Sequence, residues 1–179
     1  MLVDGENVFC ESDLVAWYVA EKFKTGNQLI PEDPVKNLKM KWFASAMSGK
    51  IMSTFFSFRG YPKKSEEDKE KVKENAHKLF EELEKILVLP YAMGEQFSLA
   101  DVFCYPFLAR WIVVSHYVKF PIDPKYSRVH EWINNIEQRP AVKATKQEDE
   151  VFIEAFASYY VSWCINLKIC QYIKNPEWT

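Results

Sequence analysis

The chain has 179 residues, of which 48% are hydrophobic, so it is long enough to bury a substantial core. Its 23 basic and 25 acidic residues give a formal net charge of -2, which excludes a global basic field that would attract nucleic acid or anionic membranes. Only 5 glycines, together with 16% aromatic residues, favour an all-helical body over a sheet protein with tight hairpins.

The N-terminal stretch MLVDGENVF places Asp4 and Gly5 between two short apolar runs. This pattern predicts a reverse turn that joins two strand ends. Apolar residues then recur at helical spacing, and Gly26 follows as a stop. We therefore expect a first helix from about Ser12 to Lys24.

The segment NQLIPED at 27–33 is polar at both ends and contains a proline. Such a segment is typical of a connection between packed units. It predicts a small N-terminal unit at 1–26 and a second unit at 34–179.

Two long helices are expected at the start of the second unit. Asp33 is a good N-cap and Pro34 suits the first helical position, so a helix should run from there to Phe58 or Arg59. Ser65 begins a capping-box-like sequence, and apolar residues at a spacing of 3.6 then predict a strongly amphipathic helix that closes before Pro90.

The next helix has a pronounced start signal. Ser98 is a good N-cap, and Asp101 three residues later can reach back to the Ser98 amide, so the two form a capping box. We interpret Asp101 as structural rather than catalytic, because this geometry already uses its carboxylate fully. The almost wholly apolar helix should be the central one, bent at Pro106.

Two more helical segments follow. One should run from about Pro124 or Ser127 to Gln138 and be stopped by Pro140. The last begins near Glu150 and is apolar on more than one side, so we expect it to lie between other elements or under a partner.

The four cysteines form no CxxC pair and no zinc-binding spacing, so we expect reduced thiols and no metal site. The N-terminus does not look like a signal peptide, and no apolar run reaches the length of a membrane span. These features predict a cytoplasmic protein.

A glycine and an aromatic residue before Ser-Leu-Ala-Asp-Val, a proline inside the helix and a later Trp-containing helix ending in Arg-Pro-Ala-Val-Lys resemble one family. The segment from roughly Pro34 onward is similar to the all-helical C-terminal domain of glutathione S-transferases. Among the subclasses of that family, it most resembles the omega-like or thiol-transferase types. The N-terminal turn, strand and helix resemble the end of the family's thioredoxin-like domain. The implied fold is mainly α: a glutathione-transferase C-terminal-like bundle preceded by a truncated thioredoxin-fold remnant.

The resemblance implies that Glu11 and Ser12 hold the γ-glutamyl end of glutathione, which would serve as co-substrate. A helix N-terminus suits a carboxylate, and Glu11 could receive the ligand's ammonium group. From the residues alone, Ser12 as an ordinary helix cap is the alternative. The family's activating Tyr, Ser or Cys and its cis-proline have no counterpart, so we assign no catalytic residue. We expect Cys10 to be a buried strand cysteine, because Val8 and Phe9 suggest an inward face.

The family's hydrophobic substrate pocket lies between its two domains. By position, the resemblance points to Trp42, Phe43 and Met47, and also to Trp163. The alternative for each of them is ordinary core packing.

Two functions follow from the resemblance. The first is a glutathione transferase that retains part of the glutathione site and lacks full catalysis as written, with conjugation or thiol transfer if an N-terminal segment completes it. The alternative is a non-catalytic protein-interaction module of the kind found in elongation factor 1 gamma. The implied partners are glutathione, a hydrophobic small molecule, and a homodimer mate or protein partner, but not nucleic acid or membrane.

Overall fold

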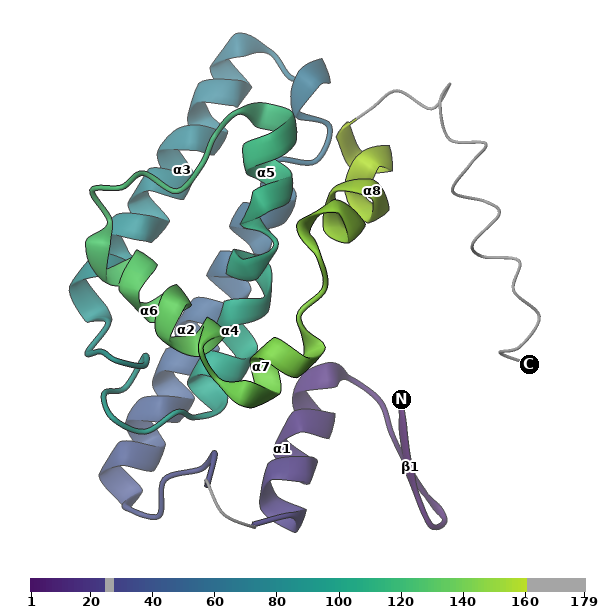
Figure 1. The fold of residues 1–179 in the computed structure, drawn as a ribbon, viewed down its shortest axis with the longest axis vertical. Helices are drawn as coiled ribbons and strands as arrows, with labels where there is room; N and C mark the ends of the chain where they lie inside the picture. The colour runs from purple at the N-terminus through teal and green to yellow at the C-terminus, as the bar shows by residue number, and fades with distance from the viewer. Residues whose placement is uncertain (25–27, 161–179) are drawn as a thin grey trace.

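The computed structural model describes residues 1–24 and 28–160, and within them it is built mainly from helices that follow a short hairpin (Figure 1). In chain order the elements are β1 (Leu2–Asp4), β2 (Asn7–Phe9), α1 (Ser12–Lys22), α2 (Pro34–Ser57), the 3-10 turn η1 (Tyr61–Lys63), α3 (Glu66–Ile86), α4 (Leu99–Ala109), α5 (Trp111–Val118), α6 (Ser127–Glu137), α7 (Pro140–Thr145) and α8 (Asp149–Tyr160). The mainly helical fold expected from the sequence is confirmed.

The N-terminal hairpin forms as expected. β1 and β2 pair antiparallel, with Leu2 opposite Phe9, and Gly5 occupies the turn at a φ of 61°, where glycine carries no steric penalty. Phe9 stacks on Tyr18 of α1 with ring centroids 4.3 Å apart. The helix ends at Lys22, two residues before the Lys24 end expected from the sequence.

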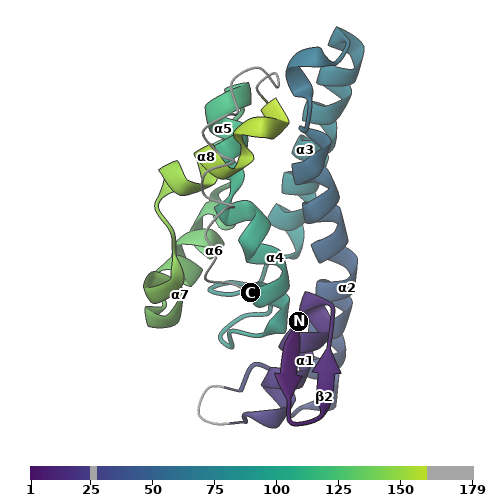
Figure 2. The same cartoon turned by 90° about the vertical axis from the view of Figure 1, so that its right-hand side faces the viewer.

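The two long helices begin where their local caps place them. The Asp33 carboxylate accepts a hydrogen bond from the Lys36 amide at 2.8 Å, and the Ser65 hydroxyl accepts one from the Asp68 amide at 3.1 Å. In Figure 2, α2 and α3 run along one edge of the molecule. The inner face of α2 lies against α4, and its buried side chains form much of the core: Met40, Phe43, Ala44, Met47, Ile51 and Phe55.

The helix that contains Pro106 is central, since α4 contacts α1, α2, α5 and α6. It continues through Pro106 and ends at Ala109, and a break at Arg110 separates α4 from α5. The Arg110 guanidinium donates to the Pro106 carbonyl oxygen at 2.8 Å. The break therefore lies one turn after Pro106, where the Arg110 side chain donates to a carbonyl oxygen near the end of α4 that has no partner within the helix.

Pro140 has a second role that the sequence interpretation missed. It follows α6, as expected for a stop, but it is also the first residue of the short helix α7. A proline suits that position because the first N–H of a helix has no partner within the helix.

The last described helix, α8, packs against α5, and Tyr160 stacks on Tyr117 with ring centroids 5.0 Å apart. In the part of the chain that the structure describes, no helix has both the length and the apolarity to cross a membrane.

Candidate functional site

Glu11, at the junction between the hairpin and α1, has an unusual backbone conformation. Its φ is 66° and its ψ is 121°, and its carbonyl oxygen accepts the first helical hydrogen bond from Val15 at 3.0 Å. A non-glycine residue held at such a φ costs about 1–3 kcal/mol, and such costs concentrate at functional positions. The conformation therefore marks Glu11 as a candidate site residue.

Ser12 is the first helical residue rather than the cap of α1. Its hydroxyl donates to the Asp13 carboxylate at 3.3 Å, and no side chain accepts from the first amides of α1. The interpretation of Ser12 as an ordinary helix cap is therefore wrong. Glu11 and Ser12 are both exposed, so the first turn of α1 presents N–H groups and a hydroxyl to solvent, an arrangement that suits a carboxylate.

The start of α1 is held in place from two sides. On one side, Trp17 packs on Phe103 of α4 with ring centroids 5.9 Å apart, and the Lys41 ammonium lies 5.6 Å from the Trp17 ring centroid. On the other side, the Asp4 carboxylate accepts hydrogen bonds from Tyr18 and Lys22. The hydrogen bond from Lys22, followed by that from Tyr18, lowers the pKa of Asp4. These contacts tie the hairpin to the helix that follows Glu11.

Cys10 is exposed and lies just outside β2, so the expectation of a buried strand cysteine is wrong. The reason is that only one face of the hairpin is covered: Phe9 turns toward Tyr18, whereas Val8 points to solvent and is 58% exposed. Cys104 in α4 is buried, and burial raises the pKa of its thiol far above the ordinary value. A neutral, buried thiol is not a nucleophile.

The three described residues proposed from the resemblance as pocket residues do not lie together. Phe43 and Met47 are fully buried in the core, and Phe43 packs edge-on against Trp132 at 6.5 Å between centroids. Trp42 points the other way and is 57% exposed. Trp163 lies outside the described residues. None of the three lines a pocket considered below.

A pocket that the sequence interpretation missed lies between α4, α7 and α8. Its volume is about 180 Å³, and it is lined by Tyr105, Pro106, Ala109, Arg110, Val142, Thr145, Lys146 and Phe152. Arg110 lies over the Phe152 ring at 5.2 Å, and the Tyr105 hydroxyl donates to Glu137 at 3.1 Å. Burial, with Glu137 nearby, raises the pKa of Tyr105, so its hydroxyl stays protonated. The only sequence signal for this pocket was Pro106 inside an apolar helix.

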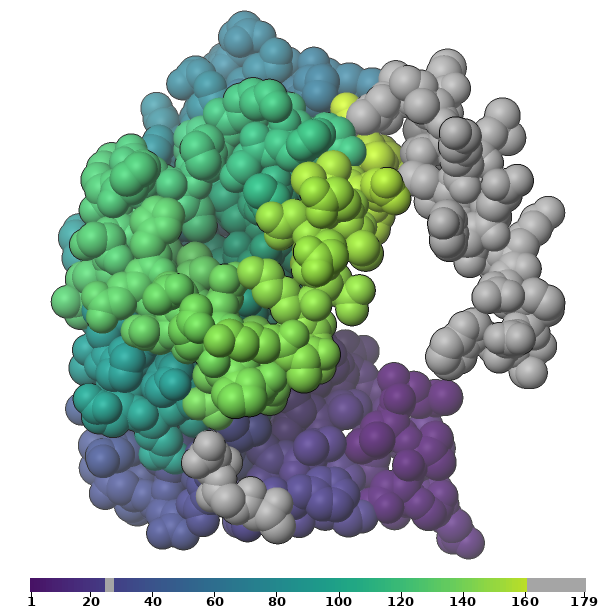
Figure 3. Space-filling view, viewed as in Figure 1, coloured from purple at the N-terminus to yellow at the C-terminus, as the bar shows by residue number. Residues whose placement is uncertain are grey.

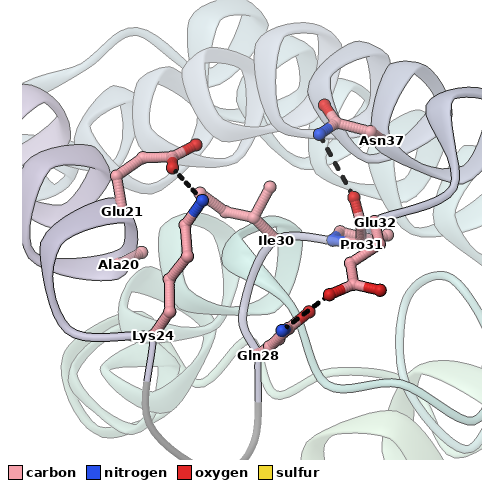
Figure 4. A pocket seen from close by; sticks show the side chains of 8 residues that line it. All are labelled: Ala20, Glu21, Lys24, Gln28, Ile30, Pro31, Glu32 and Asn37. Atoms are coloured by element: carbon pink, nitrogen blue, oxygen red, sulfur yellow. Dashed lines mark hydrogen bonds and ion pairs between the residues drawn. The ribbon is translucent and has the colours of Figure 1, made fainter.

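A second pocket, of about 220 Å³, lies at the connection between α1 and α2 (Figure 4). Its polar side chains satisfy one another: Lys24 pairs with Glu21 at 2.8 Å, and the Gln28 amide donates to Glu32 at 3.0 Å. Asn37 donates to the Pro31 carbonyl oxygen at 3.3 Å. Because these groups already have partners, we interpret this pocket as part of the connection rather than as a ligand site.

Asp101 has a structural environment. Its Oδ1 accepts from the Ala92 amide and the Trp132 indole, both at 2.8 Å, and its Oδ2 accepts from the Ser98 amide at 2.9 Å and the Ser98 hydroxyl at 3.3 Å. Asp101 and Ser98 form a capping box and have no exposed surface. Burial raises the pKa of Asp101, and the hydrogen bonds oppose that shift.

Among residues 1–24 and 28–160, no group of three His, Cys, Asp or Glu side chains is placed to hold a metal ion. In the space-filling view of Figure 3, an open gap separates the hairpin from α8.

Comparison with known proteins places these features in a family context. Residues 66–135 match the family model described as the C-terminal domain of glutathione S-transferase. A probable glutathione transferase omega-2 of Caenorhabditis elegans is 26% identical over 166 residues, which cover 88% of this chain and 65% of that protein. Glutathione S-transferase 3 of Glycine max is 23% identical over 146 residues, which cover 81% of this chain and 65% of the relative. The chain thus spans just under two thirds of the length of these relatives.

Solved structures show the same fold. Glutathione transferase Omega 3C from Trametes versicolor matches with a TM-score of 0.73 at 21% identity, over 84% of this chain and 64% of that one. A glutathione transferase homolog from Drosophila mojavensis, solved with bound glutathione, matches with a TM-score of 0.68 at 19% identity, over 87% of this chain and 71% of that one. The resemblance deduced from the sequence is confirmed.

Proposed function

We propose that this chain, a member of the glutathione transferase family, binds glutathione by its γ-glutamyl end at the start of α1. The observation that carries the proposal is the φ of 66° at Glu11. A strained backbone conformation of this kind persists at an exposed junction where it positions a functional group. The resemblance to glutathione transferases suggests glutathione as the ligand, and the residues at this junction carry groups that could bind its γ-glutamyl end.

Each charged group of the γ-glutamyl end has a partner of the right kind. The ligand's α-carboxylate would accept from the amides of the first turn of α1 and from the Ser12 hydroxyl, and the helix dipole would favour its charge. The Glu11 carboxylate would accept from the ligand's ammonium group. Asp13 adds a second negative charge beside the ammonium position, and it would give up its hydrogen bond from Ser12 to the ligand.

The family reaction that we propose is conjugation or thiol transfer, with glutathione as co-substrate. The pocket between α4, α7 and α8 would receive the apolar part of the second substrate against Val142 and Phe152. Arg110 at the same pocket would favour an acceptor that carries a negative charge. We assign no activator of the glutathione sulfur to any described residue.

Isothermal titration calorimetry tests this half-site with two ligands. The first is glutathione, and the second is its analogue in which a methyl group replaces the thiol. Because the proposed contacts involve only the γ-glutamyl end, both ligands should bind with Kd values within about threefold of each other. Glu11→Gln should weaken both by about tenfold or more, since the ion pair with the ammonium is lost. Glu131→Gln, an exposed change on α6, is the matched control and should leave both unchanged.

Three results would overturn the proposal: no binding of either ligand, binding that depends on the thiol, or binding that Glu11→Gln leaves intact. In the first case the non-catalytic interaction module becomes the better description of the chain.

A further inference from the structure

The helix α2 carries large apolar side chains on its outer side as well as on its buried side. Val35 is 60% exposed, Leu38 is 69% exposed and Trp42 is 57% exposed. Steps of three and four residues place these side chains next to one another along one face of the helix. We call them the outer strip of α2. Single exposed apolar residues are ordinary, but neighbouring large ones form a patch, and apolar patches mark interaction surfaces.

Lysines border the outer strip on both sides. Of the 24 residues of α2, four are lysines and none is acidic. Lys36, Lys39 and Lys41 belong to the same turns as the strip and are exposed. At about 100° of rotation per residue, Lys39 lies on one flank of the strip and Lys41 on the other. Among residues 1–24 and 28–160, no carboxylate forms an ion pair with any of these three lysines.

Two acidic residues, Glu32 and Asp33, precede α2 and are already used within the chain. Glu32 accepts a hydrogen bond from the Gln28 amide at 3.0 Å, and Asp33 accepts one from the Lys36 backbone amide at 2.8 Å. The lysines extend further along the helix, beside the outer strip, where α2 has no carboxylate. This face is therefore locally basic, although the net charge of -2 describes the whole chain.

We propose that the outer strip and its lysines dock this protein on the surface of a membrane that contains anionic lipids. The helix lies in the plane of the membrane surface, with Leu38 and Trp42 inserted between the headgroups and the acyl chains. A tryptophan ring suits this depth because it is apolar but carries a polar N–H. The flanking lysines lay their aliphatic stems along the strip and place their ammonium groups at the level of the lipid phosphates.

The kind of cation on this face favours a lipid surface over a protein partner. Protein interfaces are enriched in arginine and depleted of lysine, whereas every basic residue of α2 is a lysine. Helices that lie on membranes combine lysines on their polar side with Trp and Leu on the apolar side. A membrane also needs no matching groove, and α2 runs along one edge of the molecule in Figure 2, with its outer side open.

Cosedimentation of the full chain with lipid vesicles tests the proposal. One set of vesicles is made of phosphatidylcholine alone, and the other contains phosphatidylserine as well. Each lysine near an anionic surface contributes about fivefold, so the native chain should bind the phosphatidylserine vesicles at least about tenfold more tightly. Raising the salt concentration from about 0.1 M to about 0.5 M should weaken this binding, because salt screens the lysines from the headgroups.

One variant tests the apolar part of the contact. Trp42→Gln removes the largest side chain of the outer strip and should weaken binding to the phosphatidylserine vesicles by about tenfold or more. Val88→Gln, at an exposed apolar position after α3, is the matched control and should leave binding within about twofold of the native chain.

A double variant tests the electrostatic part. Lys36→Gln and Lys39→Gln together remove two charges beside the strip and should weaken binding by about tenfold or more. Lys119→Gln and Lys125→Gln together remove the same charge from the exposed connection between α5 and α6. This control should stay within about twofold of the native chain, because attraction to the membrane falls off within a Debye length.

Thermal melts followed by circular dichroism verify that every variant is folded. A native chain that does not cosediment with phosphatidylserine vesicles at about 1 mM lipid and about 0.1 M salt would overturn the proposal. Equal binding to both kinds of vesicle would also overturn it, as would folded Trp42 or lysine variants that bind like their controls. A chain that ignores vesicles but associates with itself in sedimentation equilibrium, and loses this association in Trp42→Gln, would assign the strip to a protein interface instead.

Discussion

Replacing Asp101 by asparagine tests whether this carboxylate holds the helical body together. An asparagine fits the same space but offers one oxygen instead of two. The native carboxylate faces two donors at each oxygen, from Ala92 and Trp132 on one side and from the Ser98 amide and hydroxyl on the other. The orientation of lowest energy places the amide nitrogen of the new asparagine near Ser98. The Ser98 hydroxyl can rotate to accept from this nitrogen, but the Ser98 backbone N–H loses its hydrogen-bond acceptor.

The size of the effect follows from that one group. A buried donor left without an acceptor costs about 1–3 kcal/mol. Loss of the negative charge from the first turn of α4 adds about 0.3–1 kcal/mol. Removing a charge that burial disfavours recovers part of this, so the free energy of unfolding should fall by about 1–3 kcal/mol. For a chain of this size that lowers Tm by about 2–4 °C for each kcal/mol.

Urea denaturation, followed by tryptophan fluorescence and by helical circular dichroism, measures this loss. Asp149→Asn, at the exposed start of α8, is the matched control: it removes a first-turn charge without a buried hydrogen bond and should change stability by less than about 1 kcal/mol. A loss at Asp101 no larger than in the control would refute the claim that its four hydrogen bonds support the fold.

Three further predictions concern other parts of the molecule. The Glu84 carboxylate accepts from the amides that begin α6, including that of Arg128 at 2.9 Å, so Glu84→Ala should lower stability by about 1–2 kcal/mol in urea melts. Gly49→Ala should stabilise the monomer by about 1 kcal/mol in melts of dilute protein, because the added methyl meets no neighbour. The pKa of Asp4 is lower in the folded chain than its ordinary value of 3.8. Its ion pair with Lys22 therefore contributes stability at pH values above 3.8, and this stability is lost as the pH falls through the pKa of the folded state. The protection of the hairpin amides against hydrogen exchange, relative to the intrinsic rate at each pH, should fall over that pH range in the native chain but not in Asp4→Asn.

Local signals made much of the fold readable from the sequence. Asp33 and Ser65 begin α2 and α3 because an N-cap needs only residues three positions apart, and the Asp4-Gly5 turn is equally local. The break at Arg110 was not readable, because it depends on which carbonyls near Pro106 find a partner.

The candidate site was readable only in part. The pair Glu11 and Ser12 was found through the family pattern, but the positive φ of Glu11 has no sequence signature in a non-glycine residue. The exposure of Cys10 and Trp42 was missed, because apolar patterning shows which faces of an element are hydrophobic but not which face another element covers. The pocket at Arg110 and Phe152 brings together residues far apart in the chain, which periodicity cannot reveal.

The most direct test of the proposed glutathione site is a titration followed by NMR, with the backbone amides of the chain assigned. Added glutathione should shift the amides of Ser12, Asp13 and Leu14, and the analogue that lacks the thiol should shift the same amides in the same direction. The shifts should be lost in Glu11→Gln. Shifts confined to other parts of the chain, or no shifts at millimolar glutathione, would contradict the account.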